Sequence, residues 1–253
     1  IYTALKGVRG RKSVDLAALE RLMVRFSQLI AEQRWIKELD INPLLASPER
    51  LLALDARVVV YGPEVTEKEL PRLAIRPYPS QYVGEWTSKT GARMTIRPIR
   101  AEDEPGLVRF HESLSDRSVY MRYLQPLLLT QRVAHERLAR ICHIDYDRQM
   151  ALVAEEHLPD GSSEIRGVVR MTRSHHTNEA HFSLLVSDCC QGQGIGSELV
   201  RRLVDVARQE KVELLAAEMA QDNTGMESIL KKLGFTIVPS KNEGMLRGEL
   251  VLS

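Results

Sequence analysis

The chain has 253 residues, and 43% of them are hydrophobic, which is enough to bury the core of one large domain or of two small ones. Its 35 lysine and arginine residues nearly balance its 34 aspartate and glutamate residues, so the formal net charge is +1 and no nucleic-acid or membrane partner is expected. There is no apolar stretch of about 18 residues. The three cysteines, Cys142, Cys189 and Cys190, have no metal-binding spacing, so we expect a protein of the reducing cytoplasm without a bound metal.

The first predicted element is an amphipathic helix over Val14–Gln33, with Ser13 as a possible N-cap. Its apolar stripe consists of Leu16, Leu19, Leu22, Met23, Phe26, Leu29 and Ile30. Two strands are expected to follow, over Ile36–Ile41 and Arg50–Val60, and the helix would pack on them. Prolines at 63, 71, 77 and 79 then indicate an extended linker over residues 63–80.

Three motifs in this first region resemble the closing segment of an ATP-grasp subunit: Lys6–Gly10, Glu38–Leu44 and Ala53–Arg57. The resemblance implies that residues 1–62 are the C-terminal fragment of an ATP-grasp domain of the acyl-CoA synthetase beta type, cut from a longer polypeptide. In complete relatives an Asn and an Asp of these motifs hold magnesium, and they map to Asn42 and Asp55. The alternative is that Asn42 is a turn residue before a proline and Asp55 a strand-end carboxylate.

Residues 81–253 predict a second, larger α/β domain. A hairpin, Tyr82–Thr87 with Arg93–Pro98, leads into helices near Pro105–Ser113 and Gln131–Arg140. The later elements are expected in the order strand Met150–Glu156, strand Ile165–Arg173, strand His181–Val186, a helix after Ser197, strand Val212–Met219, helix Met226–Leu233 and a last strand from Gly234-Phe235.

The glycine-rich run Gln191–Gly196 lies between an apolar strand and an amphipathic helix. Glycines let the backbone approach an anion closely, and the first N–H groups and the dipole of the new helix point toward it. The run is therefore a candidate pyrophosphate site, although a plain tight turn would use the same residues.

Gln191-x-x-Gly194-x-Gly196, a second strand, Asn223, a short helix and Lys232-Leu233-Gly234-Phe235, in that order, resemble the GNAT superfamily of acetyl-CoA-dependent N-acetyltransferases. The resemblance extends from Met94 to Ser253. Two segments, Thr95–Asp103 and Ser115–Tyr123, are similar to the Pat-type bacterial protein lysine acetyltransferases, whose catalytic domain is often fused to an NDP-forming acyl-CoA synthetase.

This resemblance implies a GNAT fold of the α/β (α+β) class for residues 81–253, preceded by the small α/β ATP-grasp remnant. We expect a mixed, mostly antiparallel seven-stranded sheet with flanking helices, splayed open where the family's fourth strand, His181–Val186, ends. Acetyl-CoA would lie in that cleft, with a backbone N–H near Leu185 or Val186 polarising its carbonyl. The other implied cofactor contacts are Gln191, Gly192, Gln193, Gly194, Ile195, Gly196, Ser197 and, on the pantetheine arm, Asn223.

Acetyl transfer to lysine requires a neutral amine, and neutralising a free lysine at pH 7 costs about 4 to 5 kcal/mol, so a general base is valuable. In the resembling family the base is a Glu ten residues before the glycine turn, and that position is His181 here. Glu179 lies two residues earlier on the same strand face, roughly 6 to 7 Å away, and would orient the ring or act itself. Glu218 on the neighbouring strand, or no protein base, are the remaining alternatives. Many GNAT enzymes protonate the leaving sulfur with a Tyr whose position is Leu230 in this chain.

Three functions follow from these patterns. The first is acetylation of lysine side chains in proteins such as acyl-CoA synthetases, by an enzyme that uses acetyl-CoA. The second is acetylation of a small amine or a protein N-terminus, which an acidic, narrow acceptor cleft would favour. The third is a non-catalytic module that senses acyl-CoA for a synthetase.

Overall fold

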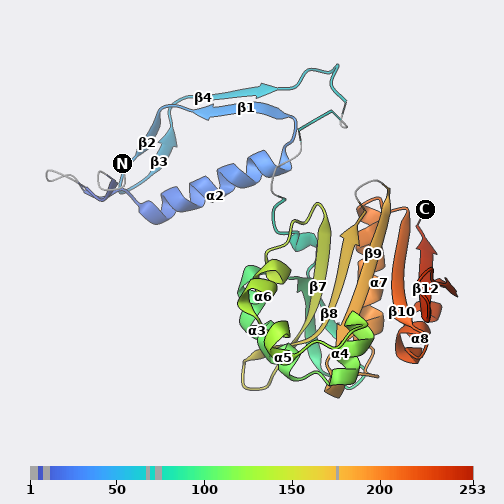
Figure 1. The fold of residues 1–253 in the computed structure, drawn as a ribbon. Helices are drawn as coiled ribbons and strands as arrows, with labels where there is room; N and C mark the ends of the chain where they lie inside the picture. The colour runs from blue at the N-terminus through green and yellow to red at the C-terminus, as the bar shows by residue number, and fades with distance from the viewer. Residues whose placement is uncertain (1–4, 8–11, 67–68, 72–75, 175–176, 253) are drawn as a thin grey trace. The chain divides into compact units, whose positions relative to one another are not determined.

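The computed structural model of the protein describes residues 5–7, 12–66, 69–71, 76–174 and 177–252, and it divides into two compact units, Ile1–Ala74 and Ile75–Ser253 (Figure 1). The division falls within the predicted linker, of which residues 67–68 and 72–75 lie outside the described part. Residues 8–10 of the first ATP-grasp motif also lie outside it. Beyond the division, Arg76 forms a bidentate ion pair with Glu210 at 2.6 and 2.7 Å within the second unit.

The first unit contains one long helix and two short antiparallel strand pairs. Helix α2 (Leu16–Glu32) begins after Asp15, whose carboxylate accepts a hydrogen bond from the Ala18 N–H at 2.9 Å, so the predicted cap at Ser13 is wrong by two residues. Strand β1 (Ile36–Ile41) pairs with β4 (Ala56–Val60), and β2 (Leu44–Ala46) pairs with β3 (Leu51–Ala53). The single strand predicted over residues 50–60 is therefore two strands, which belong to different pairs.

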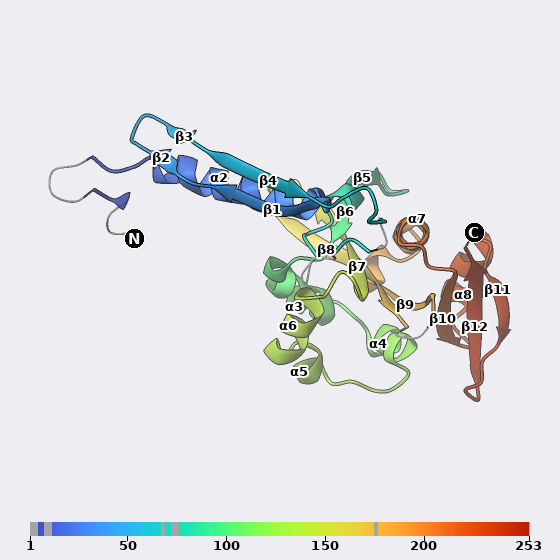
Figure 2. The same cartoon turned by 90° about the horizontal axis from the view of Figure 1, so that it is seen from above.

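Helix α2 has no buried residue, although its apolar stripe was predicted to pack on the strands. It lies along the β1–β4 pair in both views, but two strands offer too little apolar surface to cover it (Figures 1 and 2). Met23 is 63% exposed and Leu29 42% exposed. Within the described residues the first unit thus has very little hydrophobic core.

The second unit is built on an eight-stranded sheet in the order β11-β12-β10-β9-β8-β7-β6-β5. Its strands are β5 (Gly84–Thr87), β6 (Arg93–Pro98), β7 (Gln149–His157), β8 (Ser163–Arg173), β9 (Glu179–Val186), β10 (Leu214–Ala220), β11 (Thr236–Pro239) and β12 (Met245–Val251). All neighbours are antiparallel except β9 and β10. The predicted fold class is confirmed. The sheet has one strand more than predicted, because the chain after Phe235 turns back on itself as the hairpin β11–β12.

Helices cover both faces of this sheet (Figure 2). On one face lie α3 (Glu104–Glu112), α4 (Asp116–Tyr123), α5 (Leu129–Arg132) and α6 (His135–Cys142), and on the other lie α7 (Ile195–Gln209) and α8 (Thr224–Lys232). Strand β9 separates two cores: Phe182 packs with α7, whereas Leu185 packs on the α3–α6 side. The strand's odd-numbered and even-numbered residues therefore serve different faces.

The parallel pairing of β9 with β10 is short, as the resemblance implied. Glu179, Ala180 and His181 pair with Leu214, Leu215 and Ala216, and the two strands then separate. Beyond this point β9 continues along β8 as far as Val186, while β10 continues along β12 as far as Ala220. The sheet is thus splayed between the two strands.

A buried ion-pair network fixes the start of α3 to the sheet. The Arg97 guanidinium donates to both Asp103 carboxylate oxygens at 2.7 and 2.8 Å, and its Nε donates to Glu155 at 2.8 Å. Burial alone would lower the pKa of Arg97, but its bonds to Asp103 and Glu155 outweigh burial and raise it. The same contact with Arg97 lowers the pKa of Glu155.

Removing the Asp103 charge should therefore destabilise the second unit. We expect Asp103→Asn to lower the free energy of unfolding by about 3 to 5 kcal/mol, because the buried Arg97 loses its bidentate partner. Asp205→Asn breaks an exposed pair with Arg201 and should cost less than about 1 kcal/mol. Urea denaturation measures both.

The ion pair of Arg97 with Glu155 also makes stability depend on pH. Because the folded-state pKa of Glu155 is lowered, the stability that this pair contributes is present above the ordinary pKa of 4.5 and is lost as the pH falls below it.

Candidate active site

The glycine turn before α7 uses its glycines for two different reasons. Gly192 and Gly194 have φ values of +76° and +96°, in a region that residues other than glycine rarely adopt. Gly196 lies in the first turn of α7, where an added Cβ would come within 3.0 Å of Ile229 Cδ1 and 3.1 Å of Leu184 Cδ2. The first requirement shapes the turn, and the second lets α7 approach α8 and β9.

The N-terminus of α7 is open to a ligand. Its N-cap is Gly194, which has no side chain to cap the helix, so the N–H groups of the first turn have no side-chain partner at that position. Such N–H groups, with the helix dipole, favour an anion.

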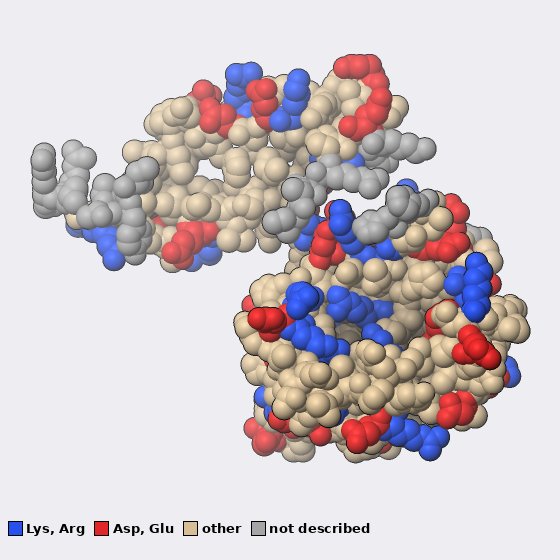
Figure 3. Space-filling model, viewed as in Figure 1, with Lys and Arg blue, Asp and Glu red and all other residues tan. Residues whose placement is uncertain are grey.

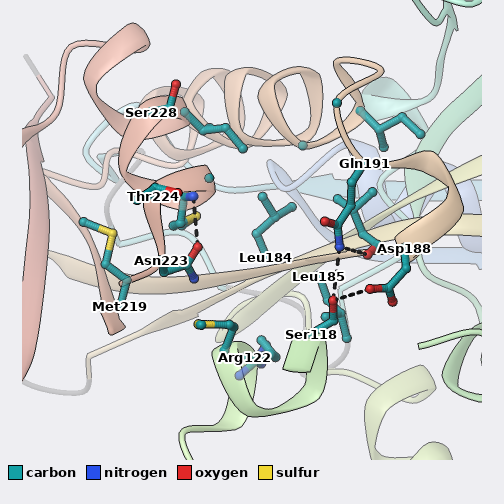
Figure 4. A pocket seen from close by; sticks show the side chains of 18 of the residues that line it. Ser118, Arg122, Leu184, Leu185, Asp188, Gln191, Met219, Asn223, Thr224 and Ser228 are labelled. Atoms are coloured by element: carbon teal, nitrogen blue, oxygen red, sulfur yellow. Dashed lines mark hydrogen bonds between the residues drawn. The ribbon is translucent and has the colours of Figure 1, made fainter. Parts of the chain in front are cut away.

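A cavity of about 710 Å³ extends from this turn into the splay between β9 and β10 (Figure 4). Figure 4 shows Gln191 and Asp188 at one side, Asn223 and Thr224 from the start of α8 at the other, and Ser118 and Arg122 from α4. The predicted cofactor residues that line it are Leu185, Val186, Gln191, Gly192, Gly194, Ile195, Gly196, Ser197 and Asn223. Gln193 does not line it, because its side chain accepts from Thr90 and donates to the Cys189 carbonyl.

The register of β9 distinguishes Leu185 from Val186. The Ser187 N–H donates to the Arg166 carbonyl at 2.8 Å, so alternate residues back along β9, including Leu185, direct their backbone groups to β8. The backbone of Leu184 and Val186 points to the other side, where β10 has separated. Of the two residues predicted to offer an N–H to a bound carbonyl, Val186 directs its backbone toward the splay, as Leu184 does, while Leu185 lines the cavity and directs its backbone toward β8.

Asn223 lines the cavity at the start of α8. It is the N-cap of α8, and its Oδ1 accepts a hydrogen bond from the Met226 N–H at 3.1 Å. This contact fixes the side chain at the cavity wall, and among the described residues its amide nitrogen has no hydrogen-bond acceptor, so it can donate to a ligand carbonyl.

Asp188 ties α4 to the glycine turn. Its carboxylate accepts hydrogen bonds from the Ser115 N–H at 2.9 Å, the Ser115 hydroxyl at 2.7 Å and the Ser118 hydroxyl at 2.8 Å. Burial opposes ionisation of Asp188, but these three bonds outweigh it and lower the pKa. Gln191 Nε2 donates to the same Ser118 hydroxyl at 3.1 Å, so the start of α4 and the glycine turn belong to one hydrogen-bond network.

Three basic residues of the cavity were not predicted from the sequence. Lys89, in the β5–β6 turn, lies 3.6 Å from the position of a Cβ at Gly194, and Arg117 and Arg122 come from α4. They are distant from the glycine turn in sequence. No local sequence pattern links Lys89 and the basic residues of α4 to the glycine turn. Only the fold brings these three segments together around the cavity.

The three candidate bases lie in different places. Glu218 on β10 lines the cavity, and its carboxylate accepts from the Ser240 hydroxyl at 2.8 Å and from Asn242 Nδ2 at 3.0 Å. His181 is exposed at the last paired position before the splay, and Glu179 lies at the start of β9. Neither belongs to the cavity wall. Leu230, at the position of the family's Tyr, is fully buried and offers no proton donor.

In the first unit, Asn42 and Asp55 are neighbours across a strand pair. The Asn42 N–H donates to the Asp55 carbonyl at 3.2 Å. Across the described residues no group of three or more His, Cys, Asp or Glu side chains could hold a metal ion. One amide and one carboxylate would hold magnesium only together with phosphate oxygens.

We therefore expect this chain not to bind magnesium-ATP with micromolar affinity. Calorimetry with ATP and excess magnesium should give no saturable heat, and Asp55→Asn should titrate like the unaltered chain. Saturable binding that Asp55→Asn abolishes would contradict this expectation and make the first unit a nucleotide site.

Comparison with known proteins agrees with this geometry. The family model described as an acetyltransferase (GNAT) domain matches residues 93–236, and the chain therefore belongs to the GNAT acetyltransferases. A second model, described as an ATP-grasp domain, matches residues 1–60. The chain is thus a GNAT N-acetyltransferase with an ATP-grasp-like fragment at its N-terminus.

Individual relatives match each part. An acetyltransferase of Pseudomonas aeruginosa is 28% identical over 145 residues, which are 57% of this chain and 76% of that protein. The beta subunit of an ADP-forming acetate–CoA ligase of Pyrococcus furiosus is 41% identical over 59 residues, 23% of this chain and only 25% of that subunit. The crystal structure of the GNAT domain of S. lividans PAT superposes with a TM-score of 0.62 at 29% identity, covering 69% of this chain and 99% of that one. Within the described residues we find no helix with the length and apolar character to cross a membrane.

Proposed function

We propose that this protein transfers the acetyl group of acetyl-CoA to lysine side chains of other proteins, acyl-CoA synthetases of the cytoplasm among them. The observation that carries the proposal is the cavity that joins the uncapped N-terminus of α7 to the splay between β9 and β10. The similarity to S. lividans PAT and the ATP-grasp-like fragment support the choice of acceptor.

In this proposal acetyl-CoA lies in the cavity with its pyrophosphate at the glycine turn and its thioester in the splay. Its pyrophosphate would bind the N–H groups at the start of α7, with Lys89 and Arg117 supplying positive charge. The pantetheine arm would run past Asn223 into the splay, because its amide carbonyls can accept hydrogen bonds from the Leu184 and Val186 N–H groups that face the splay. The thioester carbonyl would then accept from one of these N–H groups, which stabilises the negative charge of the tetrahedral intermediate.

Glu218 is the general base in this proposal. A carboxylate on the cavity wall can accept the proton of the lysine ammonium, directly or through one water molecule, and the neutral amine then attacks the thioester carbon. The C–S bond breaks as the intermediate collapses, and water carries the proton that the attacking nitrogen loses to the leaving thiolate, since Leu230 cannot supply one. Ser240 and Asn242 hold the carboxylate in place.

The acceptor side of the site does not favour a small cationic amine. Such an acceptor would call for an acidic, narrow cleft, but the neighbouring cavity wall carries arginines and no carboxylate. A pure sensor would need only the cofactor cavity, whereas the wall of this cavity also carries Glu218, a carboxylate that can serve as a base.

Incubation with acetyl-CoA and a purified acyl-CoA synthetase tests the proposal, with acetyl-lysine measured by mass spectrometry. Acetyl-lysine should form only with the active chain, and a Gly194→Glu variant is the matched control. If acetyl-CoA binds by calorimetry but no lysine of several synthetases is acetylated, the protein acceptor is wrong. If no amine of any kind is acetylated, the chain acts as an acyl-CoA sensor.

A further inference from the structure

A second cavity, of about 460 Å³, lies on the face of the sheet that carries α3 to α6. It shares Arg122, Ser183 and Leu185 with the cofactor cavity, so the two adjoin along β9. A group bound in the second cavity is therefore next to the splay where the thioester would lie. It is on the acceptor's side of the site, because the cofactor's own path runs from α7 through the splay.

Four arginines surround this second cavity: Arg122 from α4, Arg137 and Arg140 from α6, and Arg170 from β8. Figure 3 shows basic side chains gathered around a hollow on this face of the unit. No carboxylate lines the cavity, and within the described part of the chain none of the four guanidinium groups forms an ion pair.

The contacts that these arginines do make are all with neutral groups. Arg137 donates to the Arg132 carbonyl at 3.1 Å, Arg140 to the Glu136 carbonyl at 3.0 Å, and Arg170 to the Gln149 side chain. The guanidinium carbons of Arg122 and Arg137 lie 4.8 and 5.0 Å from the centre of the Tyr123 ring. These contacts hold the guanidinium groups in position and leave their charge uncompensated.

His111 gives an independent indication of a ligand. The residue is only 3% exposed and lines the cavity, yet its Nδ1 has no hydrogen-bond partner among the described residues. Burial, and after it Arg137, Arg132 and Arg122, lowers the pKa of His111 to about 4. Burial also lowers the pKa of Arg122 and Arg170, and their neighbouring guanidinium groups lower it further.

An anion in the cavity would remove both anomalies. It would compensate the like charges that now face one another, and it would raise the pKa of His111 so that Nδ1–H can donate to it. Carboxylate and phosphate oxygens match the fork geometry of arginine. We propose that the second cavity is an anion subsite of the acceptor, which binds a carboxylate or phosphate group carried close to the amine that is acetylated.

This inference rests on the proposed lysine acetylation and defines its acceptor further. In a protein, the anion would be an acidic or phosphorylated side chain near the acceptor lysine. In a small molecule, it would be a carboxylate or phosphate on the amine itself, as the α-carboxylate is in free lysine.

Matched acceptors test the inference on the full chain. The first set contains peptides with one lysine and a Glu, phosphoserine or Gln at one to three positions on either side of it, and the second contains free lysine beside lysine amide. At the best position, the anionic peptide should have a kcat/KM roughly 10- to 100-fold above that of the Gln peptide, the usual effect of charge-assisted hydrogen bonds. A preference confined to free lysine over lysine amide would assign the subsite to a small acceptor.

Arginine variants then connect the preference to the cavity. In Arg137→Gln/Arg170→Gln the ratio of anionic to neutral kcat/KM should fall toward one, and Arg170→Lys should retain part of it. Arg109→Gln removes an exposed charge on α3 outside the cavity and should keep the full ratio. Acetyl-CoA affinity, measured by calorimetry, shows that each variant is folded.

The outcomes separate the two proposals. Equal rates with anionic and neutral acceptors in the unaltered protein, or a ratio that survives the double variant, would overturn the anion subsite and leave lysine acetylation standing. No transfer to any lysine acceptor, despite normal acetyl-CoA binding, would instead overturn the proposed function.

Discussion

Gly194→Glu should lower the affinity for acetyl-CoA by at least about 100-fold. Gly194 has a φ of +96°, so any side chain there adds backbone strain of about 1 to 3 kcal/mol. The new carboxylate would lie at the N-terminus of α7, where the pyrophosphate is expected, and repulsion between charges about 4 Å apart near a surface is worth up to about 4 kcal/mol. The strain lowers the stability of the free and the bound chain alike, so the repulsion determines the loss of affinity, and it is large enough to exceed the roughly 2.7 kcal/mol that corresponds to 100-fold.

Gly161→Glu is the matched control for this experiment. Gly161 has a φ of +84° in the turn before β8, with nothing within 4 Å of an added Cβ, and it does not line the cavity. The Gly161→Glu variant has the same backbone strain, but its new carboxylate is not next to the pyrophosphate site. It should therefore lose some stability and keep its affinity for acetyl-CoA. Calorimetric titration with acetyl-CoA measures both. Unchanged affinity in Gly194→Glu would show that the pyrophosphate does not bind at this turn.

Glu218→Gln should lower kcat/KM for acetylation by about 10²- to 10⁴-fold, the usual contribution of a positioned base. The amide keeps the size of the side chain but cannot take a proton, so binding of acetyl-CoA should change little. A loss in kcat without a matching loss in cofactor affinity identifies a group that acts in the chemical step. Steady-state kinetics with a lysine peptide, beside calorimetry with acetyl-CoA, measure the two.

His181→Ala and Glu179→Gln are the informative comparisons, because the family's position for the base coincides with His181. Both residues lie outside the cavity wall, so we expect changes of a few-fold or less. Glu213→Gln, at an exposed residue just before β10, controls for loss of a negative charge. A Glu218→Gln enzyme with full rate beside an inactive His181→Ala enzyme would move the base to His181.

Some parts of this site could be predicted because they are local demands of the chain. A backbone φ near +96° at Gly194 requires a glycine, and the helix that begins there requires apolar residues at helical spacing on its buried face. Both features can be predicted from consecutive residues of the sequence. The order of strands and helices around them follows in the same way. Periodicity alone could not separate Leu185 from Val186, because one residue of register exchanges the two sides of a strand.

Other parts depend on contacts between distant segments. His111, Arg122, Arg137 and Arg170 come from three helices and a strand, and no local pattern marks them as one cavity. The sequence predicts a single strand from Gly234-Phe235 where the structure has the hairpin β11–β12, because the turn over residues 240–244 follows a short edge strand. The resemblance implied the splay and named Glu218 as one candidate base, but only the assembled sheet distinguishes Glu218, which lines the cavity, from His181 and Glu179, which do not.

The three-residue pairing of β9 with β10 also has a thermodynamic consequence. The Leu184 and Val186 amides that face the splay have no strand to bond, so a ligand that bonds them completes the sheet as a structural part of it. Acetyl-CoA at 100 times its dissociation constant would then add about 2.7 kcal/mol to the stability of the second unit and raise its melting temperature by about 5 to 10 °C. Scanning calorimetry with increasing acetyl-CoA measures this, and amide hydrogen exchange at the splay should slow in parallel. A chain that binds acetyl-CoA in this way would therefore unfold less often when acetyl-CoA is plentiful.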